Sequence, residues 1–403
     1  MIKIGVIGGG ASGFFCAINI KIKNPSYKVV IYEKSNKTLS KVKISGGGRC
    51  NVTNAEIQPK NFLKNYPRGE NFLKKNFSNF KNTEVITWFA ENGVALKAEP
   101  DGRIFPKSND SQAVIDCFWT LCKKLDIEVM LNARCTAIHK FSKGLEVELN
   151  NNQRLLYDKV VVCMGGGSQR SHYETLAALG HHIITPLPSL FTFNLIDKSL
   201  SQLMGLVAKN VYIKIINTNF DNEGDLLITH WGLSGPAVIK LSAFAAQTLH
   251  ERQYQYDVKV NWVNIKNEEL VREKLNLYKN QHPQKVVFKN PLFELPHRLW
   301  EYLCRQAEIA DHTRWVDLSA KCFNKLVDQL TNSIYKCKGK TTFKEEFVTC
   351  GGIDLDEVDP QSMQSKLVSG LYFAGEVINI DGVTGGYNFQ NAWTTAYIAA
   401  QAV

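Results

Sequence analysis

Gly8-Gly9-Gly10-Ala11-Ser12-Gly13 is the stretch of this chain that decides its fold. Residues 2–7 before it form a short run of β-branched and apolar residues, which is typical of a buried parallel strand. Residues 11–23 carry Ala, Cys, Phe and Ile on one side of a predicted helix. Strand, glycine turn and helix in this order indicate the start of a dinucleotide-binding βαβ unit.

Each glycine of this fingerprint has a physical purpose. Gly8 permits the tight turn, Gly10 lets the backbone approach a diphosphate, and Gly13 lets the helix pack closely on the strand. Ala11 and Ser12 stand at the helix N-terminus, where free N–H groups bind phosphate oxygens. A glycine turn can also serve packing alone, but the strand before it and the order of the elements favour a nucleotide site.

A second apolar run, residues 28–32, ends at Glu33, about 20 residues after the last glycine of the fingerprint. A carboxylate at this spacing accepts hydrogen bonds from an adenosine ribose. We assign Glu33, with Lys34 beside it, to the same cofactor site and expect the βαβ unit to end here.

The far end of the chain carries a matching pattern. Gly375-Glu376 follows an apolar run, and a second glycine-rich turn at residues 381–387 leads into a predicted helix. We expect such a chain to fold both of its ends around one long cofactor. The sequence therefore predicts that FAD is bound.

Residues 41–54 contain three consecutive glycines flanked by Ser, Arg and Asn. A loop of this kind offers backbone N–H donors and one fixed positive charge, which suits it to wrap a ribityl diphosphate and to approach a flat ring. A flexible surface turn is the alternative. The candidate cofactor-binding residues of the loop are Lys41, Ser45, Gly46, Gly47, Arg49, Cys50 and Asn51.

Length and composition are those of an ordinary globular protein. A chain of 403 residues with 44% apolar and 21% charged residues is expected to form two or three domains. We expect no signal peptide and no membrane span, because the first residues read as a strand and no apolar stretch reaches about 18 residues. Ten cysteines stand singly without zinc-ligand spacing, so we expect no metal site and reduced thiols in the cytoplasm.

The net charge of +10 raises the question of nucleic acid. Much of the excess comes from residues 60–81, where lysines alternate with Phe62, Phe72, Phe77 and Phe80. Basic and aromatic residues together can bind RNA, but these phenylalanines are favoured as the buried side of helices whose solvated face carries the lysines. An anionic substrate or a phosphate-bearing nicotinamide cofactor also suits a positive surface.

Six sequence blocks in one order resemble a bacterial family of NAD(P)- and FAD-dependent oxidoreductases that includes BaiN and RdsA. The blocks are the N-terminal fingerprint, the loop 41–54, and residues 101–106, 229–236, 348–353 and 365–391. The resemblance spans the whole chain, and chance glycine turns would not reproduce the order of its blocks.

The resemblance implies an α/β fold in which a discontinuous, glutathione-reductase-like FAD-binding Rossmann domain carries an inserted β-barrel and a helical subdomain. The FAD-binding domain would comprise residues 1–189 and 347–403, the β-barrel domain 190–265 and 334–346, and the helical subdomain 266–333. Short strand-like segments within 211–263 and a helical pattern over 268–330 support such an insertion. The candidate core positions of the helical part are Leu270, Leu275, Leu299, Leu303, Leu318 and Leu326.

The resemblance also assigns further residues to the cofactor. A strand around residues 131–136 would pair its backbone with the adenine edge and place Cys135 near that ring. The Glu376 carboxylate would bind ribityl hydroxyls, and the last helix would direct its N-terminus at the flavin pyrimidine, where reduction builds negative charge. The other residues assigned to the cofactor are Gly165 and Gly166 after a buried strand, Gly375, Gly386, Tyr387 and Asn388.

The candidate catalytic residues are His230, Cys50 and Arg103. His230 is either a proton donor near neutral pH or a structural histidine at a turn between barrel and helix. Cys50 is either a thiol that faces the flavin or a buried small residue, and the second is favoured because the chain has no CxxC partner. Arg103, like Arg49, would hold an anionic substrate or form a structural salt bridge.

A second dinucleotide fingerprint is missing, because Gly165 and Gly167 are followed by Arg170 where a third glycine is needed. We therefore expect NAD(P)H to bind transiently as the reductant. The favoured function is NAD(P)H-driven reduction of an unsaturated or disulfide-like small organic molecule by hydride transfer through flavin N5. The alternatives are an RNA-modifying flavoenzyme and a flavin-binding protein without enzymatic activity. The sequence carries no signal for oligomeric state.

Overall fold

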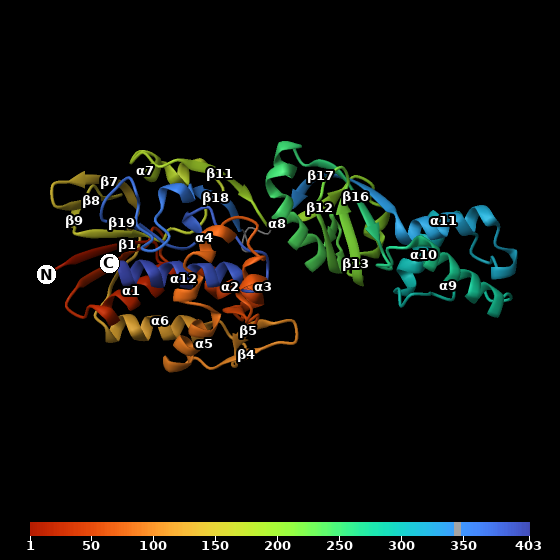
Figure 1. Cartoon of the computed structure of the whole chain (residues 1–403), viewed down its shortest axis with the longest axis horizontal. Coiled ribbons are helices and arrows are strands. Elements are labelled where there is room, and N and C mark those ends of the chain that lie inside the picture. Colours follow the sequence, from red (N-terminus) through yellow and green to blue (C-terminus); the bar gives the residue numbers. More distant parts are fainter. Residues whose placement is uncertain (342–347) are drawn as a thin grey trace. The chain divides into compact units, whose positions relative to one another are not determined.

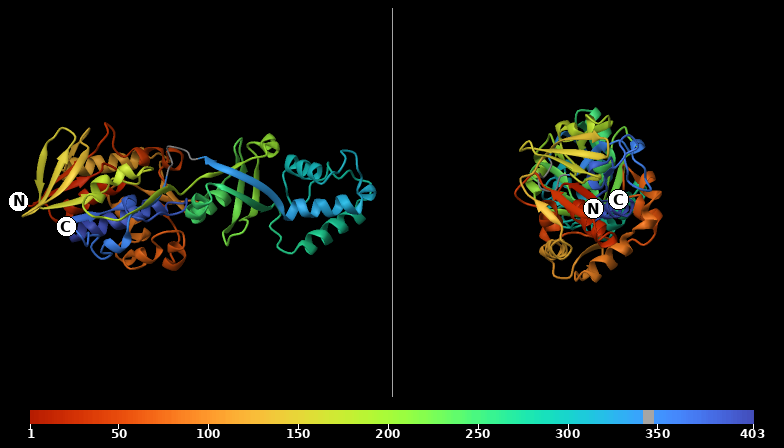
Figure 2. Two further views of the ribbon diagram at one scale, coloured as in Figure 1. Left: turned by 90° about the horizontal axis from the view of Figure 1, so that it is seen from above. Right: turned by 90° about the vertical axis from the view of Figure 1, so that its left-hand side faces the viewer.

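The computed structural model describes residues 1–341 and 348–403. The chain divides into two compact units: unit 1 comprises Met1–Ser189 with Lys344–Val403, and unit 2 comprises Leu190–Phe343 (Figure 1). The predicted change of domain at residues 189 and 190 is also where unit 2 begins, whereas the one at residues 346 and 347 lies outside the described residues. Unit 1 contains both chain termini, which lie at the same end of it (Figure 2).

A five-stranded parallel sheet forms the centre of unit 1, in the order β19-β10-β1-β2-β6. From β1 the chain adds β2 and β6 on one side, and later β10 and β19 on the other. This reversal creates a switch point between the carboxyl ends of β1 and β10, where open α/β sheets bind ligands. The strands are β1 (Lys3–Ile7), β2 (Lys28–Tyr32), β6 (Glu128–Met130), β10 (Lys159–Val162) and β19 (Leu371–Phe373).

Nearly continuous apolar runs explain why β1 and β2 lie at the centre, since all but the first residue of each strand is buried. Strands of this kind occur in parallel sheets that helices cover. Helices α1 (Ala11–Lys23) and α12 (Tyr387–Ala402) lie side by side against the sheet (Figures 1 and 2). The ring centroid of Phe15 in α1 is 5.2 Å from that of Trp393 in α12, so the first and last helices share one aromatic core.

Three smaller sheets surround the central one in unit 1. They are β3-β5-β4 (Thr53–Asn54, Arg103–Pro106, Leu96–Ala98), β7-β8-β9 (Cys135–Phe141, Gly144–Leu149, Arg154–Tyr157) and β11-β18 (Ile183–Pro188, Thr349–Ile353). The other helices are α2 (Ser40–Gly48), α3 (Pro59–Leu63), α4 (Glu70–Lys74), α5 (Asn82–Glu91), α6 (Gln112–Lys124) and α7 (Glu174–Ala177), with short 3-10 helices η1 (Phe77–Asn79), η2 (Arg170–Tyr173), η5 (Leu355–Glu357) and η6 (Gly375–Val377).

The basic stretch at residues 60–81 belongs to unit 1. It folds into α3, α4 and η1, and Phe62, Phe72, Phe77 and Phe80 are all buried. The prediction that these rings form the inner side of helices is therefore confirmed, while the lysines between them face solvent. The alternation of lysine and phenylalanine in this stretch reflects amphipathic packing.

Unit 2 contains the predicted β-barrel, which is closed in the order β12-β15-β14-β13-β16-β17. Helix α8 (Pro236–Glu251) packs against four of its strands. The barrel strands are β12 (Thr192–Leu195), β13 (Val207–Ile215), β14 (Asp221–Ile228), β15 (Gly232–Ser234), β16 (Gln255–Asn261) and β17 (Ser333–Thr341). Along β13 and β17 buried residues alternate with more exposed ones, as a strand with one inward face requires.

The helical part of unit 2 shares one hydrophobic core with the barrel, and Trp262, Trp300 and Trp315 are buried in it. Its elements are α9 (Glu268–Gln281), α10 (His297–Gln306) and α11 (Ala320–Thr331), with 3-10 helices η3 (Ser199–Leu203) and η4 (Trp315–Asp317). Side chains cap two of the helices, since Asn267 accepts the Glu269 N–H and Ser319 accepts the Cys322 N–H.

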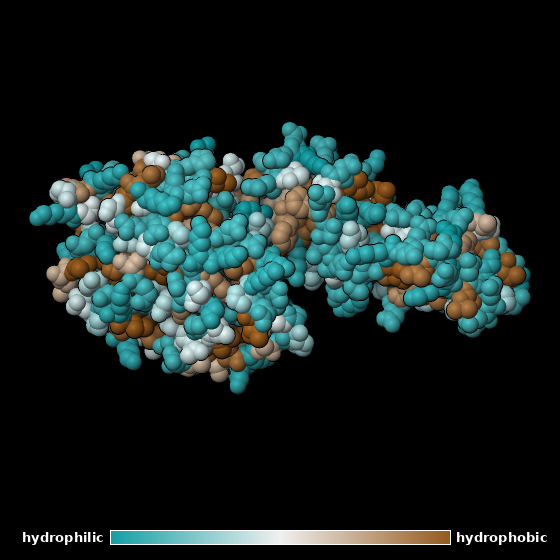
Figure 3. All heavy atoms as spheres, viewed as in Figure 1, coloured by the Kyte–Doolittle hydropathy of each residue, from teal (hydrophilic) through white to brown (hydrophobic). Residues whose placement is uncertain are grey.

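Five of the six leucines predicted for this core are buried, namely Leu275, Leu299, Leu303, Leu318 and Leu326. Leu270 is wrong as a core position, because it lies in the first turn of α9 with 47% of its surface exposed. Figure 3 shows that hydrophilic side chains cover most of the visible surface and that hydrophobic ones gather in small separate patches. Over the described ranges, every helix is too short or too polar to cross a bilayer.

A buried histidine joins two distant segments of unit 1. His181 Nδ1 lies 2.9 Å from a carboxylate oxygen of Glu357, and its Nε2 lies 3.0 Å from the hydroxyl of Ser365. The Ser365 hydroxyl also accepts the N–H groups of Leu367 and Val368. Burial lowers the pKa of His181 below its ordinary value, even though Glu357 acts in the opposite direction. His181 is therefore neutral in the folded protein at neutral pH.

We predict that unfolding becomes easier as the pH falls below about 6.5, the ordinary pKa of histidine. In this pH range the histidine of the unfolded chain is protonated, whereas buried His181 in the folded protein stays neutral. The free energy of unfolding therefore decreases as the pH falls from about 7 to the lower pKa of the folded state. Urea unfolding at pH 7.5 and 5.5 measures the difference, which should be smaller in His181→Gln than in the wild type. An equal difference in both proteins would contradict the assignment, and exposed His312→Asn is the control.

Candidate cofactor site

At the switch point of the unit 1 sheet, the ends of β1 and β10 and the start of α1 pack very closely on one another. Gly8, at the end of β1, has a φ of +117°, and a Cβ atom there would lie 2.3 Å from the carbonyl oxygen of Cys163 at the end of β10. A Cβ atom on Gly13 would lie 1.9 Å from the carbonyl oxygen of Gly8. These two glycines therefore let α1 approach the sheet, as the fingerprint predicts.

Gly10 behaves differently from its two neighbours in the fingerprint. No atom of the described chain lies within 4 Å of a Cβ placed on Gly10, so its outer side faces open space. Gly10 is the N-cap of α1, and neither a capping side chain nor an acidic residue of the described chain satisfies the first turn, which includes Ala11 and Ser12. Free N–H groups and the positive end of the helix dipole thus face a space that admits a diphosphate.

Glu33 stands at the end of β2 next to the fingerprint. Its carboxylate accepts hydrogen bonds from the N–H of Gly9 at 2.9 Å and from the N–H and hydroxyl of Ser35 at 2.9 and 2.8 Å. These bonds fix the orientation of the carboxylate, and its role as a ribose acceptor stays a prediction.

The segment beside Glu33 corrects the sequence interpretation. The predicted strand at residues 131–136 begins later, since β6 ends at Met130 and β7 starts at Cys135. Residues 131–134 form a connection whose Ala133 N–H donates to the Glu33 carbonyl at 2.8 Å. Cys135 is half-buried, and burial raises the pKa of its thiol to about 12, so a backbone role stays the prediction for this residue.

Positive charge gathers beside the glycine turn that follows β10. His172 Nε2 lies 3.2 Å from the carbonyl oxygen of Gly165. Burial lowers the pKa of His172, and the nearby ammonium groups of Lys34 and Lys41 lower it further. No atom of the described residues lies within 4 Å of a Cβ built on Gly165. The Gly165 turn is therefore open, with two lysines and the Glu376 carboxylate close to it.

Glu376 is held by donors from three separate segments. Its carboxylate accepts the Lys41 ammonium at 2.8 Å, the Thr349 N–H at 2.8 Å and the Gly166 N–H at 3.2 Å. Burial acts to raise the pKa of Glu376, but Lys41 and the two N–H groups outweigh it and hold the pKa below its ordinary value. Glu376 is thus a fixed, ionised acceptor, as expected of a group that binds ribityl hydroxyls.

The loop predicted over residues 41–54 is partly helical, which corrects the expectation. α2 begins at Ser40, and its regular course breaks at Ser45, where ψ is 148°, and at Gly46 and Gly47, which have left-handed φ values of 58° and 68°. A left-handed run of this kind presents successive N–H groups to one side. A Cβ on Gly47 would meet no described atom within 4 Å, so this turn is also open.

Both arginines of this region form structural ion pairs. Arg49 donates to Glu99 at 2.6 Å, and its guanidinium carbon lies 4.0 Å from the centroid of the Phe105 ring. Arg103 pairs with Asp101 at 2.6 Å and with Glu99 at 3.4 Å. Both arginines thus form the salt bridges of the structural alternative, and a substrate-binding role of Arg103 stays a prediction.

Cys50 is fully buried beside the glycine turn, with a left-handed φ of 60°. Burial raises the pKa of its thiol to about 12, although a hydrogen bond with Ser45 acts the other way. A thiolate at neutral pH is excluded by this environment. The geometry supports the buried-residue alternative over a redox-active Cys50.

The C-terminal turn docks on the segment that follows Cys50. Oriented to suit its neighbours, the Asn51 amide accepts the Gly386 N–H at 2.9 Å and donates to the Thr53 carbonyl at 3.0 Å. A Cβ on Gly386 would lie 2.4 Å from the Thr53 carbonyl oxygen. Asn54 donates to the Gly385 carbonyl at 3.0 Å. The N-terminal loop and the start of α12 are therefore one structural element.

Two other predicted cofactor residues near the C-terminus, Tyr387 and Asn388, form hydrogen bonds within or onto this turn. Asn388 accepts the Gly382 N–H and donates to the Gly382 carbonyl, both at 2.8 Å, so its side chain shapes the turn. The Tyr387 carbonyl accepts the hydroxyl of buried Tyr66 at 2.7 Å. A Cβ on Gly375 would lie 2.7 Å from the hydroxyl of Ser12, which brings Gly375 onto the N-terminal fingerprint.

The residues of unit 1 fit FAD. Within the described chain, the buried polar atoms Thr349 Oγ1 and Asn391 Oδ1 have no hydrogen-bond partner, although buried oxygens of this kind are normally satisfied. The N-terminus of α12 carries neither a side-chain cap nor an acidic residue within the described part of the chain. Open glycine turns, clustered cations and a fixed carboxylate thus form a continuous set of groups for an elongated dinucleotide.

Several residues of this set escaped the sequence analysis. Thr349 lies in a block that the resemblance singled out, but its role depends on Gly166 and Glu376, which are far from it in sequence. The sequence analysis also did not predict the buried ion pair of Arg68 and Asp381. In this pair Arg68 Nε donates to a carboxylate oxygen of Asp381 at 2.7 Å. Burial raises the pKa of Asp381, and Arg68 and Ser189 counteract it.

His230 belongs to unit 2, whereas the cofactor-binding candidates belong to unit 1. It lies exposed in the turn between β14 and β15, and its ring centroid is 4.5 Å from that of Trp231. Its role as a proton donor stays a prediction.

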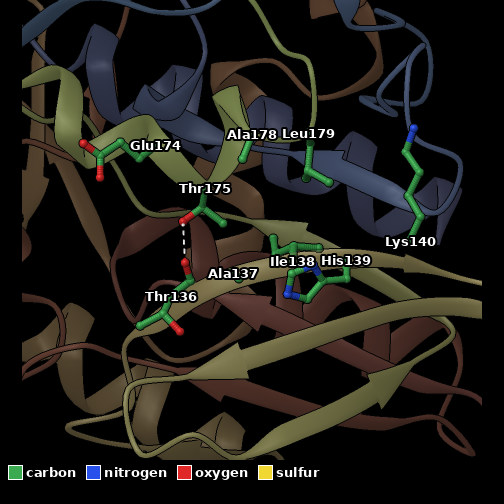
Figure 4. A pocket seen from close by; sticks show the side chains of 9 residues that line it. All are labelled: Thr136, Ala137, Ile138, His139, Lys140, Glu174, Thr175, Ala178 and Leu179. Carbon is green, nitrogen blue, oxygen red and sulfur yellow. Dashed lines mark hydrogen bonds between the residues drawn. The ribbon is translucent and has the colours of Figure 1, made fainter.

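A separate cavity of about 440 Å³ lies in unit 1 between β7 and α7 (Figure 4). The hydroxyl of Thr175 donates to the Thr136 carbonyl across its rim at 3.3 Å. Its lining residues are Thr136, Ala137, Ile138, His139, Lys140, Glu174, Thr175, Ala178 and Leu179, which include none of the predicted cofactor residues.

Fold and site together define a Rossmann-type FAD-binding α/β protein with an inserted closed barrel. Residues 2–402 match the family described as HI0933-like protein Rossmann domain, and the chain belongs to that family. The resemblance drawn from the sequence blocks is thereby confirmed.

Two curated relatives cover this chain almost completely. A ribosomal RNA dihydrouridine synthase of Haemophilus influenzae is 28% identical over 409 residues, which cover 99% of this chain and 97% of that protein. A 3-dehydro-bile acid delta(4,6)-reductase of Clostridium scindens is 25% identical over 410 residues, which cover 100% of this chain and 99% of that protein. The solved 3-ketosteroid delta1-dehydrogenase of Sterolibacterium denitrificans shares the fold, with a TM-score of 0.51 and 11% identity over 100% of this chain and 99% of that chain.

We predict that alanine weakens FAD binding at one fingerprint glycine and lowers the stability of the fold at another. Gly10→Ala should leave the stability of the apoprotein unchanged, because its Cβ meets no described atom, but should weaken FAD binding about tenfold or more by intruding on the diphosphate. Gly13→Ala should lower the stability itself by about 1–3 kcal/mol, because its Cβ collides with Gly8. Thermal unfolding of the apoprotein and fluorescence titration with FAD measure the two effects. Wild-type FAD affinity in Gly10→Ala would contradict the placement of the diphosphate.

Proposed function

We propose that this protein is an FAD-dependent reductase that adds two hydrogens to a carbon–carbon double bond conjugated with a carbonyl group, and that its substrate is uridine in RNA. The observation that carries the proposal is the convergence of both chain ends at the switch point of unit 1. There the fingerprint, the glycine turn of α2 and the start of α12 present open backbone donors and fixed charges to one elongated ligand.

Different groups of the chain would bind different parts of FAD. The N-terminus of α1, with Lys34 and Lys41 nearby, would bind the diphosphate, and Glu33 the adenosine ribose. Glu376 would bind the ribityl hydroxyls. The N-terminus of α12 would stabilise negative charge on the flavin pyrimidine. When bound, FAD supplies hydride transfer from a reductant to the substrate.

The names of the two relatives point to one kind of chemistry. Formation of dihydrouridine adds hydrogen to the double bond between carbons 5 and 6 of uracil, which is conjugated with the carbonyl at carbon 4. A delta(4,6)-reductase of a 3-dehydro compound reduces double bonds conjugated with a ketone. In uracil a hydride adds to carbon 6 and a proton to carbon 5, and NAD(P)H is oxidised to NAD(P)⁺. The residue that we propose as proton donor is His230, since imidazole exchanges protons near neutral pH.

RNA is the substrate class that the chain's charge favours. The net charge of +10 suits a polyanion, although the sequence alone favoured a small molecule. The free thiols of all ten cysteines fit a reducing compartment such as the cytoplasm. The second candidate is a free unsaturated ketone, which the similarity to the bile acid reductase supports.

Anaerobic reduction of the flavin tests the proposal. We expect NADH or NADPH to bleach the visible flavin band without RNA, and a uridine-containing transcript to restore it while some uridines gain two hydrogens by mass spectrometry. Restoration by an unsaturated ketone but not by RNA would replace the first candidate with the second. A flavin that neither reductant bleaches would refute the proposal and leave a non-enzymatic flavin-binding protein.

A second prediction concerns proton supply. His230→Asn should reduce the rate of flavin reoxidation by the transcript by about 100-fold or more, the typical contribution of a positioned acid, while reduction by NAD(P)H continues at the wild-type rate. Stopped-flow absorbance measures the two half-reactions separately. His312→Asn changes another exposed histidine of unit 2 and serves as the control. Equal reoxidation rates in His230→Asn and the wild type would remove His230 from the mechanism.

A further inference from the structure

One end of the unit 2 barrel brings two loops together. The N–H of Leu195 donates to the Trp231 carbonyl at 3.0 Å, and the N–H of Gly205 donates to the Ile228 carbonyl at 2.9 Å. The turn between β14 and β15 thus lies beside the segment that follows β12.

Hydrogen bonds and a close backbone contact fix the conformation of the turn between β14 and β15. The Thr229 hydroxyl oxygen accepts the N–H of Gly232 at 3.1 Å and that of Trp231 at 3.3 Å. Gly232 has a φ of +151°, and a Cβ there would lie 2.2 Å from the Phe193 carbonyl oxygen. A turn fixed in this way presents its side chains to solvent without a large loss of freedom on binding.

Large apolar side chains are exposed on these two loops. Trp231 has 44% of its surface exposed, Ile196 57% and Met204 58%. An exposed tryptophan ring presents a large flat face on which a ring of a ligand can stack. The Trp231 ring is neighboured by the ring of His230, which offers a second flat surface.

Two lysines lie at these loops. Lys198 is exposed, and its ammonium donates to the Trp231 carbonyl at 3.0 Å. The carbonyl of Lys336 accepts the Ile196 N–H at 2.9 Å, and its side chain points outward from β17. The carboxylate of Asp197 is exposed beside these lysines, and its two oxygens accept the N–H and hydroxyl of Ser199, both at 2.8 Å. A further carboxylate belongs to Asp257, the strand partner of Lys336.

We propose that this end of the barrel, which we call the Trp231 surface and define by Ile196, Lys198, Met204, His230, Trp231 and Lys336, binds single-stranded RNA. The Trp231 ring stacks on a base, while the ammonium groups of Lys198 and Lys336 contact phosphates. The inference rests on the proposed function, since it supplies RNA contacts on unit 2 in addition to the proposed role of His230. Stacking on one aromatic ring is tolerant of sequence, so the surface positions RNA and does not select the uridine.

The test compares variants of the full-length FAD-loaded protein for binding of a labelled single-stranded RNA. We expect Trp231→Ala to weaken binding by about 10- to 100-fold, the range that loss of one stacked base produces, and Trp231→Phe to retain most of the affinity. Lys198→Gln and Lys336→Gln should each reduce the slope of log affinity against log salt by about 1. Trp119→Ala removes a tryptophan with 41% exposure from unit 1 and should change nothing.

Flavin content, the circular dichroism spectrum and the rate of flavin reduction by NAD(P)H establish that the variants are folded, and all three should match the wild type. Wild-type RNA affinity in Trp231→Ala, with RNA reduction intact, overturns the surface and leaves the proposed function standing. Failure of the wild type to bind or reduce RNA overturns both. A change from dimer to monomer in Trp231→Ala on sedimentation assigns the surface to a second copy of this chain and also overturns the inference.

Discussion

The fold of unit 1 depends on close contacts at glycines, within the N-terminal fingerprint and between the two ends of the chain, that leave no room for a side chain. Gly375 lies on Ser12, Gly386 on Thr53, and Gly13 on Gly8, and in each case an added Cβ would collide with an atom already there. Such contacts bring the helix termini close to the strand ends, where we propose that FAD binds. They are specific because any larger residue would separate the segments that carry the cofactor-binding groups.

Electrostatics complements this packing. Lys34, Lys41 and the N-terminus of α1 create positive potential on one stretch of the site, while Glu33 and Glu376 supply fixed acceptors within it. Glu376 stays ionised although it is buried, because donors from three segments compensate for the loss of water. A dinucleotide has the same order of charges, with a diphosphate between hydroxyl-bearing sugars. The site is therefore complementary to its ligand before the ligand arrives.

The sequence predicts best what short-range periodicity determines. The limits of α1 and β2 agree with the structure to the residue, because an apolar run or a one-sided helix needs no distant partner. α2 was missed because its first turn is followed directly by three glycines, a composition typical of loops. The interpretation of Arg49 stayed open for another reason: its partner Glu99 lies 50 positions away, and only the folded chain brings the two together.

The division of unit 1 into an early and a late segment also has a consequence for synthesis on the ribosome. Residues 190–341, which form most of unit 2, emerge as one uninterrupted stretch and hold a hydrophobic core of their own. The sheet of unit 1, in contrast, is completed only by β19 and α12, which follow unit 2 in the chain. We therefore expect FAD to bind only after β19 and α12 have been synthesised, because both segments lead into groups that we assign to the cofactor.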